Sequence, residues 1–417
     1  MKIQMTYWKK RSQDEVASEI KSALQNNVDF ANTPSLGYPA SRLDEKVFTN
    51  ENLYLGNMPV LQAYMANPNH IGCHTFGTSE YASKGTQALE KELLNMVACD
   101  LFKMKEGDYD GYVSSGGTEA NLQAVWMYRN YFLREKNANP SEIAIIASED
   151  SHFSIAKAAN LLMLDYIQIP VHTEERSVKA SAFEALMNDA LMSGKKYFIV
   201  ISNMGTSMFG SVDNPDIYTN YMQERGLSFK LHIDADFGGF IYPFNELENH
   251  IDFNNPHISS IAVDAHEMLQ APFGTGIFIC RKGLIENVLV NDKSYADGVD
   301  LTVCGSRSGA NAVALWAILS TYGPHKWYEK ISILLMRTDW FCKRLDELGI
   351  KYYRDPRMNI ISIHAEYITK EIAERFQLVP QKKEINNTWY KVLIMSHVEM
   401  EHLKELLLSL EEQAMIS

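Results

Sequence analysis

The chain has 417 residues, of which 46% are hydrophobic, and this is enough apolar material for a large buried core in more than one domain. A formal net charge of -13 repels phosphate backbones, which argues against nucleic acid as a partner. No apolar run approaches the roughly 18 residues that span a bilayer, and the N-terminus lacks the apolar core of a signal peptide, so we expect a cytoplasmic protein without membrane contact.

The N-terminal part of the chain is predicted to be an arm followed by two helices. Residues 1–60 are assigned to the arm, because residues 32–38 combine Pro, Gly and Asn in the manner of a loop. From Gly85 to Phe102, apolar residues recur at three- and four-residue spacings, which predicts one face of a helix. The extended segment 111–113 then leads through a turn, Ser114–Thr118, into the second helix.

The middle of the chain alternates short apolar runs with helical patterns. Mostly apolar strands separated by helices indicate a largely parallel sheet that is covered on both faces. We therefore predict a large α/β domain over residues 61–309. Its further strands are expected at residues 143–147, 166–169, 198–201, 231–233, 260–263 and 276–280.

The C-terminal part, residues 310–417, is predicted to be a smaller α/β domain. A helical region runs over residues 310–348 and is broken at Gly323–Pro324. Two strands are expected at 359–363 and 392–395, before an amphipathic helix that begins near Val398.

The turn at Ser114–Thr118 is a candidate anion site. Small residues before a helix let backbone N–H groups approach a phosphate, and the helix N-terminus adds positive potential. The turn is neither a P-loop nor a dinucleotide-binding G-x-G-x-x-G turn. A tight turn that only caps the helix explains the same residues equally well.

Two further positions have the chemistry of a site that binds an aromatic cofactor. His152 follows a strand, where an imidazole can lie flat on a ring, although such a histidine is more often a hydrogen-bonded loop residue. Asp234 ends an apolar strand, where an ionised carboxylate needs a cationic partner such as a protonated pyridine nitrogen. The alternative for Asp234 is a carboxylate that caps a helix.

Together these segments resemble the pyridoxal 5'-phosphate (PLP)-dependent group II amino-acid decarboxylases, which have the aminotransferase-like fold of type I. That family has, in order, a phosphate turn, a ring-stacking histidine, a Gly-Thr-Thr turn, an Asp-Ala-Ala strand end, a His-Lys pair and a Gly-Ser-Arg loop. The corresponding segments here are Ser115–Thr118, His152, Gly205–Ser207, Asp234–Asp236, His266–Glu267 and Gly305–Arg307. Within the family, residues 36–39, 111–113 and 305–309 are most similar to the bacterial histidine decarboxylase branch.

The resemblance implies PLP as the cofactor, a small-molecule amino acid as the substrate and a homodimer as the assembly. Histidine, aromatic and acidic amino acids all remain open as substrates. Tyr295, in a predicted mobile loop, is the candidate acid that protonates the carbanion. The other implied roles are phosphate binding by Ser115, Gly116, Gly117 and Thr118 with His266 beside them, ring stacking by His152, pairing of Asp234 with the pyridine nitrogen, a place near the cofactor for Thr206, and closure of the site by Ser306 and Arg307 from the partner subunit.

Two positions depart from the family pattern, and both are acidic. Glu267 stands where the family has the lysine that forms a Schiff base with the cofactor, and a carboxylate cannot form one. Asp236 stands where the family usually has a small alanine under the ring. We therefore expect PLP, if bound, to be held non-covalently, and activity to be impaired or lost. Three lysines lie near these motifs in the sequence, but nothing in the sequence directs any of them to the cofactor: Lys157, Lys282 and Lys293.

Three interpretations of these departures stay open. The chain is a working decarboxylase fold with one substituted lysine, a non-catalytic relative that binds PLP or another ligand and regulates a partner, or a lysine-free enzyme with different chemistry. A metal enzyme is not expected. The sequence after His266 begins like the zinc motif H-E-x-x-H but has Gln270 in the last position, and the five cysteines lack C-x-x-C spacing.

Overall fold

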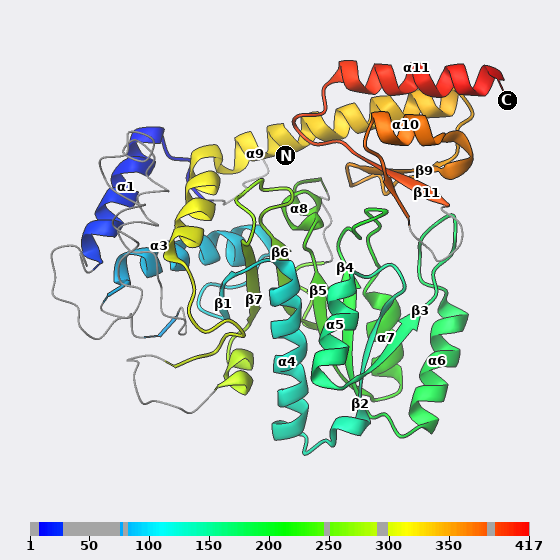
Figure 1. Ribbon diagram of the computed structural model, residues 1–417. Coiled ribbons are helices and arrows are strands. Elements are labelled where there is room, and N and C mark those ends of the chain that lie inside the picture. Colours follow the sequence, from blue (N-terminus) through cyan, green and yellow to red (C-terminus); the bar gives the residue numbers. More distant parts are fainter. Residues whose placement is uncertain are drawn as a thin grey trace, which may run out of the picture.

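The computed structural model describes residues 8–27, 76–77, 82–245, 251–289, 299–381 and 388–416 (Figure 1). The predicted loop that carries Tyr295, residues 292–298, lies outside the described residues, as does most of the predicted arm. The described part of the arm contains a helix, α1 (Gln13–Asn26), which begins with a capping box between Ser12 and Glu15. It packs on α3 and α9 of the same chain.

Seven strands form the large sheet, in the order β1-β7-β6-β5-β4-β2-β3. Strands β2 to β6 pair in parallel, whereas β7 is antiparallel to both of its neighbours, β6 and β1. This confirms the predicted mostly parallel α/β architecture of fold type I. The strands are β1 (Tyr109–Ser114), β2 (Ile143–Ser148), β3 (Asp165–Ile169), β4 (Tyr197–Asn203), β5 (Ser228–Asp234), β6 (Ile258–Asp264) and β7 (Gly276–Arg281).

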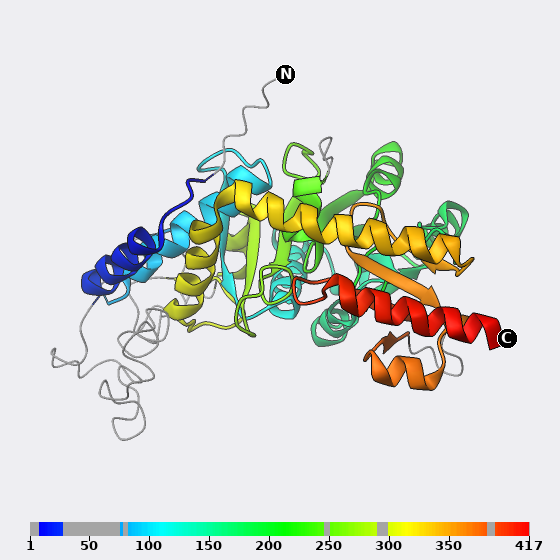
Figure 2. The same ribbon diagram turned by 90° about the horizontal axis from the view of Figure 1, so that it is seen from above.

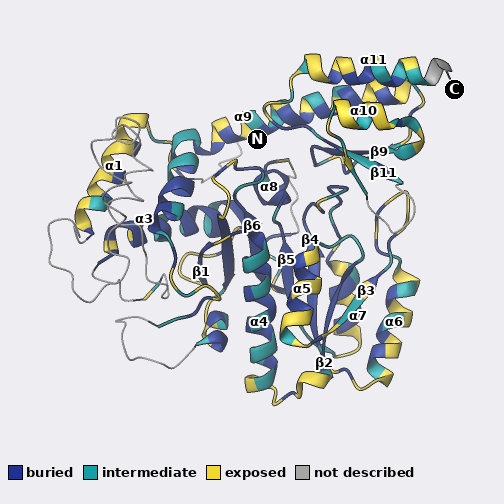
Figure 3. Ribbon diagram, in the orientation of Figure 1, coloured by how far each residue is buried: buried dark blue, intermediate teal, exposed yellow. Residues whose placement is uncertain are grey.

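Inner strands of the sheet such as β2 and β6 are buried on both faces, whereas the edge strand β3 is partly exposed (Figure 3). In β2, Ile143, Ile145 and Ala147 belong to one core cluster, while the alternate residues Ala144 and Ile146 belong to another. The first cluster is completed by α4 (Gly117–Glu135) and α5 (Phe153–Leu162), which lie in front of the sheet in Figure 1. The second is completed by α3 (Lys84–Asn95), the π-helical segment η1 (Met96–Leu101), α6 (Ala180–Met192) and α7 (Asp216–Glu224).

One long helix, α9 (Gly309–Glu347), joins the two parts of the molecule (Figure 2). Its buried residues up to Leu335 belong to the core of the large sheet, and those from Phe341 onward belong to a third core. The predicted break is present at Gly323, whose φ of 61° is non-helical. A β-carbon there would lie 2.3 Å from Cβ of Lys10, so only glycine fits without displacing the N-terminal segment. Because one helix contributes to both cores, the proposed domain limits stay a prediction.

The smaller part is a four-stranded antiparallel sheet covered by helices, with strand order β10-β11-β9-β8. It docks on a turn of the large part, where Ser362 Oγ donates to the carbonyl of Met208 at 2.8 Å and Lys391 Nζ donates to the carbonyl of Ser207 at 2.9 Å. None of the helices in the described part of the chain has both the length and the apolar content that a membrane crossing requires. The remaining elements are α8 (Tyr242–Asn245), β8 (Tyr352–Tyr353), β9 (Ile360–His364), α10 (Lys370–Arg375), β10 (Val379–Pro380), β11 (Trp389–Leu393), α11 (Met400–Ile416) and the short 3-10 turns η2 (Pro140–Glu142), η3 (Gly238–Phe240), η4 (Leu284–Val288) and η5 (Ala365–Tyr367).

Candidate active site

The predicted site residues gather at one edge of the large sheet because the strands that carry them run in the same direction. Asn203 at the end of β4 is in register with Asp234 at the end of β5. Asp264 at the end of β6 pairs with Gly276, which also pairs with Ser114 at the end of β1. Ligands of open α/β sheets bind outside the carboxyl ends of the strands, and this is such an edge.

Asn121 on α4 links three of the predicted site residues. Its Nδ2 lies 3.0 Å from Asp234 Oδ2, 3.3 Å from Asp236 Oδ2 and 3.1 Å from Ser154 Oγ. Ser154 Oγ in turn lies 2.9 Å from Nδ1 of His152, the N-cap residue of α5. The amide thus holds two strand-end carboxyls and the predicted ring-stacking histidine in one cluster. Asn121 is not among the residues expected in the site, although a polar residue one turn into a buried helix needs a hydrogen-bond partner and so marks a candidate.

In the turn between β1 and α4, the predicted anion site, backbone N–H groups donate to carboxylates of the protein itself. Gly116 has a φ of 119°, which favours glycine. The N–H of Ser115 donates to Glu119 Oε2 at 3.0 Å, and the N–H of Gly117 donates to Asp264 Oδ2 at 3.1 Å. A β-carbon at Gly117 would lie 1.9 Å from Asp236 Oδ2, so the carboxyl of Asp236 rests directly against the turn.

Asp236 is the most strongly perturbed carboxyl of the cluster. Burial raises its pKa well above the ordinary value, and the nearby charges of Asp234, Asp264 and Glu267 raise it further. Its Oδ1 is buried without a hydrogen-bond partner among the described residues. Burial also raises the pKa of Asp234, but hydrogen bonds from the backbone of Asp236 and from Asn121 oppose that shift. At neutral pH we therefore assign a proton to Asp236 and a negative charge to Asp234.

Replacing Asp236 with asparagine is expected to stabilise the cofactor-free protein increasingly as pH rises. Above about pH 4 the unfolded wild-type chain ionises this carboxyl, whereas the folded chain keeps it protonated. Wild type thus loses stability through this window, by at most about 1.4 kcal/mol per pH unit for one proton, and Asp236→Asn lacks this contribution. Melting temperatures of both proteins between pH 5 and 8 check this, with Asp189→Asn on the exposed side of α6 as the control. A stability difference that is constant with pH would contradict the assignment.

Glu267 lies in this cluster, in the turn that follows β6. Its negative charge raises the pKa of Asp236, Asp264 and His152. At His152 it opposes burial and the charge of Lys157, which both lower the pKa. It also opposes the lowering of the pKa of the half-buried Lys391 by burial. Lys391, which the sequence did not point to, is therefore the lysine of the small part that the fold brings toward position 267.

The other lysines considered as substitutes are placed differently. Lys157 Nζ lies 5.1 Å from the centre of the Phe153 ring, next to His152. Lys282 follows the far end of β7, where its Nζ donates to the carbonyl of Gly107 at 2.9 Å, at the opposite edge of the sheet. Lys293 lies outside the described residues.

The remaining predicted residues are engaged in contacts of the scaffold. Thr206 Oγ1 lies 2.7 Å from Ser211 Oγ, within the turn that carries it. Ser306 is exposed, and the side chain of His266 is partly buried beside Asp264. Arg307 forms a buried ion pair with Glu90 of α3 and donates to the carbonyl of Val113 at 3.2 Å. The roles expected for these residues at a cofactor stay predictions, as does the phosphate contact of Thr118.

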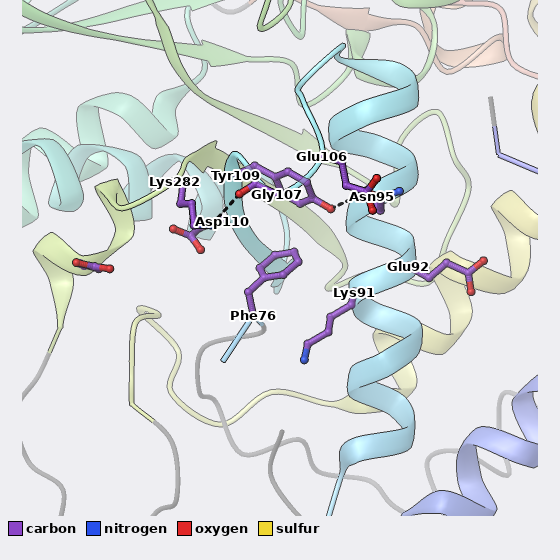
Figure 4. A pocket seen from close by; sticks show the side chains of 10 residues that line it. Phe76, Lys91, Glu92, Asn95, Glu106, Gly107, Tyr109, Asp110 and Lys282 are labelled. Carbon is purple, nitrogen blue, oxygen red and sulfur yellow. Dashed lines mark hydrogen bonds between the residues drawn. The ribbon is translucent and has the colours of Figure 1, made fainter. Parts of the chain in front are cut away.

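A cavity of about 590 Å³ lies at the opposite edge of the sheet and contains none of the predicted site residues. Figure 4 shows it between the start of β1, the end of α3 and the residue that follows β7. The cavity is lined by Phe76, Lys91, Glu92, Asn95, Glu106, Gly107, Tyr109, Asp110, Lys282 and Glu286.

Among the described residues, no group of three or more His, Cys, Asp or Glu side chains is arranged to hold a metal ion.

Comparison with known proteins gives consistent matches. A family model described as the pyridoxal-dependent decarboxylase conserved domain matches residues 49–349. A tryptophan decarboxylase of Clostridium sporogenes is 46% identical over 98% of both chains. An L-aspartate decarboxylase of Thermococcus kodakarensis is 30% identical and covers 79% of this chain and 83% of its own. The internal aldimine form of L-methionine decarboxylase from Streptomyces sp. 590 superposes with a TM-score of 0.71 at 19% identity, covering 96% of this chain and 94% of that one, which supports the fold.

The expected similarity to bacterial histidine decarboxylases is wrong, because the relative that is 46% identical along almost the whole chain is a tryptophan decarboxylase. That expectation depended on three short stretches. Residues 111–113 lie in buried β1, and residues 305–309 lie in the loop that the Arg307–Glu90 ion pair fixes. Residues 36–39 lie outside the described residues. The two described stretches belong to the scaffold of the site.

Proposed function

Because the chain belongs to the pyridoxal-dependent decarboxylase family of amino-acid lyases, we propose that it binds PLP non-covalently and that its decarboxylase activity is impaired or lost. The observation that carries this proposal is Glu267. Its carboxylate lies in the cluster of Asp236, Asp264 and His152, at the position where the resemblance places the Schiff-base lysine.

The residues around the ring and the phosphate fit PLP. Asp234 carries a negative charge at neutral pH and would hold the proton of the pyridine nitrogen, which lets the ring serve as an electron sink once CO2 has left. His152 has a lowered pKa, mainly because it is buried, so it is neutral and suited to lie on the ring. The turn at 115–118 would take the phosphate after its N–H donors exchange Glu119 and Asp264 for phosphate oxygens.

Position 267 does not fit covalent attachment. A carboxylate has no nucleophilic amine to exchange with that of the substrate. The negative charge of Glu267 also lies near the site expected for the phosphate and the substrate carboxylate, and it would repel both. Both effects act against turnover, and they support impaired activity rather than a shift of substrate.

For the substrate class we propose an aromatic amino acid, with tryptophan first. The support is the 46% identical tryptophan decarboxylase, whose identity extends over 408 residues. A homodimer is proposed with it, following the resemblance to the family, together with the expected cytoplasmic location.

A second candidate function is a non-catalytic PLP- or ligand-binding homologue that regulates a partner. The feature that favours it is the pair of acidic departures, since a single lysine substitution would explain Glu267 but not Asp236. In that case, ligand binding would be retained and lysine at position 267 would not restore turnover.

The test is cofactor binding, measured by equilibrium dialysis and by the absorption spectrum of bound PLP with a panel of amino acids. We expect reversible binding, a spectrum altered by tryptophan more than by histidine or aspartate, and little or no tryptamine. Asp234→Ala should weaken binding at least about tenfold, because a hydrogen bond to a charged group is lost, while Asp189→Ala should not. A protein that binds no PLP would refute the proposal, and rapid formation of tryptamine would refute impaired activity.

A further inference from the structure

A continuous row of buried polar side chains extends from Asp234 into the core between α4 and the sheet. Asn121, His232, Ser260 and Tyr128 are all fully buried. Asn121 Oδ1 lies 2.8 Å from His232 Nε2, and His232 Nδ1 lies 2.6 Å from Ser260 Oγ. Ser260 Oγ is also hydrogen-bonded to the hydroxyl of Tyr128. Buried polar groups are costly unless each is satisfied, so the order of donors and acceptors along this row is constrained.

The direction of each hydrogen bond follows from the end at Asp234. Because Asn121 Nδ2 faces carboxyl oxygens, it must be the amide nitrogen, and Oδ1 therefore faces His232. An amide oxygen only accepts, so His232 Nε2 carries a hydrogen. Burial lowers the pKa of His232 to about 3 and outweighs an opposing hydrogen bond to the Ser260 backbone, so the ring is neutral. With the hydrogen on Nε2, Nδ1 is the acceptor. Ser260 then donates to Nδ1 and accepts from Tyr128, and every group has a partner.

We infer that Asn121 and His232 are positioning residues for Asp234, because the Nε2–H of His232 fixes the Asn121 amide with its NH2 group toward the carboxylate. If the amide turned over, its oxygen would face Asp234 and its NH2 group would face the His232 N–H, so both contacts would be repulsive. This inference rests on the proposed function insofar as the ionised Asp234 is there to hold the pyridine nitrogen of PLP.

The same amide also connects Asp234 with the residue that is expected to lie on the ring. Ser154 Oγ, 3.1 Å from Asn121 Nδ2, lies 2.9 Å from His152 Nδ1. Asn121 thus reaches both the partner of the pyridine nitrogen and the residue expected to lie on the ring. Asp236 Oδ2, at 3.3 Å, is the most distant of the three acceptors for the two amide hydrogens. Asp236, which stands where the family usually has alanine, therefore competes with Asp234 for the amide hydrogens of Asn121.

The protonation of His232 can be measured without cofactor. Nitrogen-15 NMR of the full chain labelled at histidine, with the His232 signal assigned by its loss in His232→Gln, reports which ring nitrogen carries the hydrogen. We expect a neutral ring with hydrogen on Nε2 from pH 8 to pH 5. A charged ring, or hydrogen on Nδ1, would overturn the inference.

The positioning role predicts a pattern of PLP affinities. Asn121→Leu and His232→Leu should weaken PLP binding about 10- to 100-fold, the scale of a lost hydrogen bond to a charged group. His232→Gln should recover most of this affinity, since its amide N–H can donate to Asn121 Oδ1. Asn160→Leu on the exposed side of α5 is the matched control and should leave binding unchanged.

These measurements separate the inference from the proposed function. If wild type binds PLP and the Leu variants bind it equally well, the inference fails and the proposed function stands. If His232→Gln binds as weakly as His232→Leu at equal melting temperature, the role is packing and the inference also fails. If wild type binds no PLP, the proposed function fails, and the hydrogen position on His232 alone decides whether the row orients Asn121.

Discussion

Replacing Glu267 with lysine is expected to make the chain acquire a borohydride-stable label from PLP at residue 267. Wild type should acquire none. The lysine amine can form a C=N bond with the cofactor aldehyde and release water, which a carboxylate cannot do. Tryptophan decarboxylation should rise by at least about 100-fold, which is well within what holding the reacting groups in place can supply. Peptide mass spectrometry after reduction, and tryptamine release before it, provide the two readouts.

Glu267→Gln is the matched control for this experiment, because it removes the negative charge without supplying an amine. It should bind PLP more tightly than wild type but remain unlabelled. A folded Glu267→Lys protein without label would contradict a simple substitution, and Glu267→Lys with Asp236→Ala would then test whether the second carboxyl blocks the site. Label on wild type would refute the proposed loss of covalent chemistry, with Lys391 and Lys157 as the first residues to examine.

Replacing Glu90 with glutamine is expected to lower the free energy of unfolding by about 3–5 kcal/mol, the usual cost of removing one partner of a buried ion pair. The side chain of Glu90 is fully buried and that of Arg307 is 6% exposed, so the guanidinium would keep its charge away from water. Urea denaturation followed by circular dichroism measures the loss.

Glu92→Gln, two residues later in the same helix, is the control. Glu92 pairs with Arg11 at 2.6 Å, but its side chain is 39% exposed, so its loss should cost no more than about 1 kcal/mol. If Glu90→Gln were equally mild, Arg307 would have to be held by other partners. The expected role of Arg307 in closing the cofactor site would then gain support over the role of fixing its own loop.

Features that depend on local spacing were predictable from the sequence. The apolar run of β2 indicated a strand buried on both faces, and its alternate residues do enter two different cores. Gly323–Pro324 marked the break in α9, because proline cannot continue the helix and the preceding residue is forced out of it. Helix α1 is not among the expected elements, although Ser12 and Glu15 have the spacing of a capping box.

The order of short motifs was enough to indicate the family. The parallel strands then account for the gathering of His152, Asp234 and Glu267 at one edge of the sheet, because such strands bring their carboxyl ends together. Only the tertiary structure decided which side chains form hydrogen bonds and ion pairs with the polar residues of the site and its scaffold. Asn121 contacts Asp234 across 113 positions of the sequence, and Glu90 pairs with Arg307 across 217. The spacing of residues along a strand or helix specifies which face is buried. Which polar residue on another helix or strand becomes the partner depends on how the two elements pack. The local sequence pattern does not specify that packing.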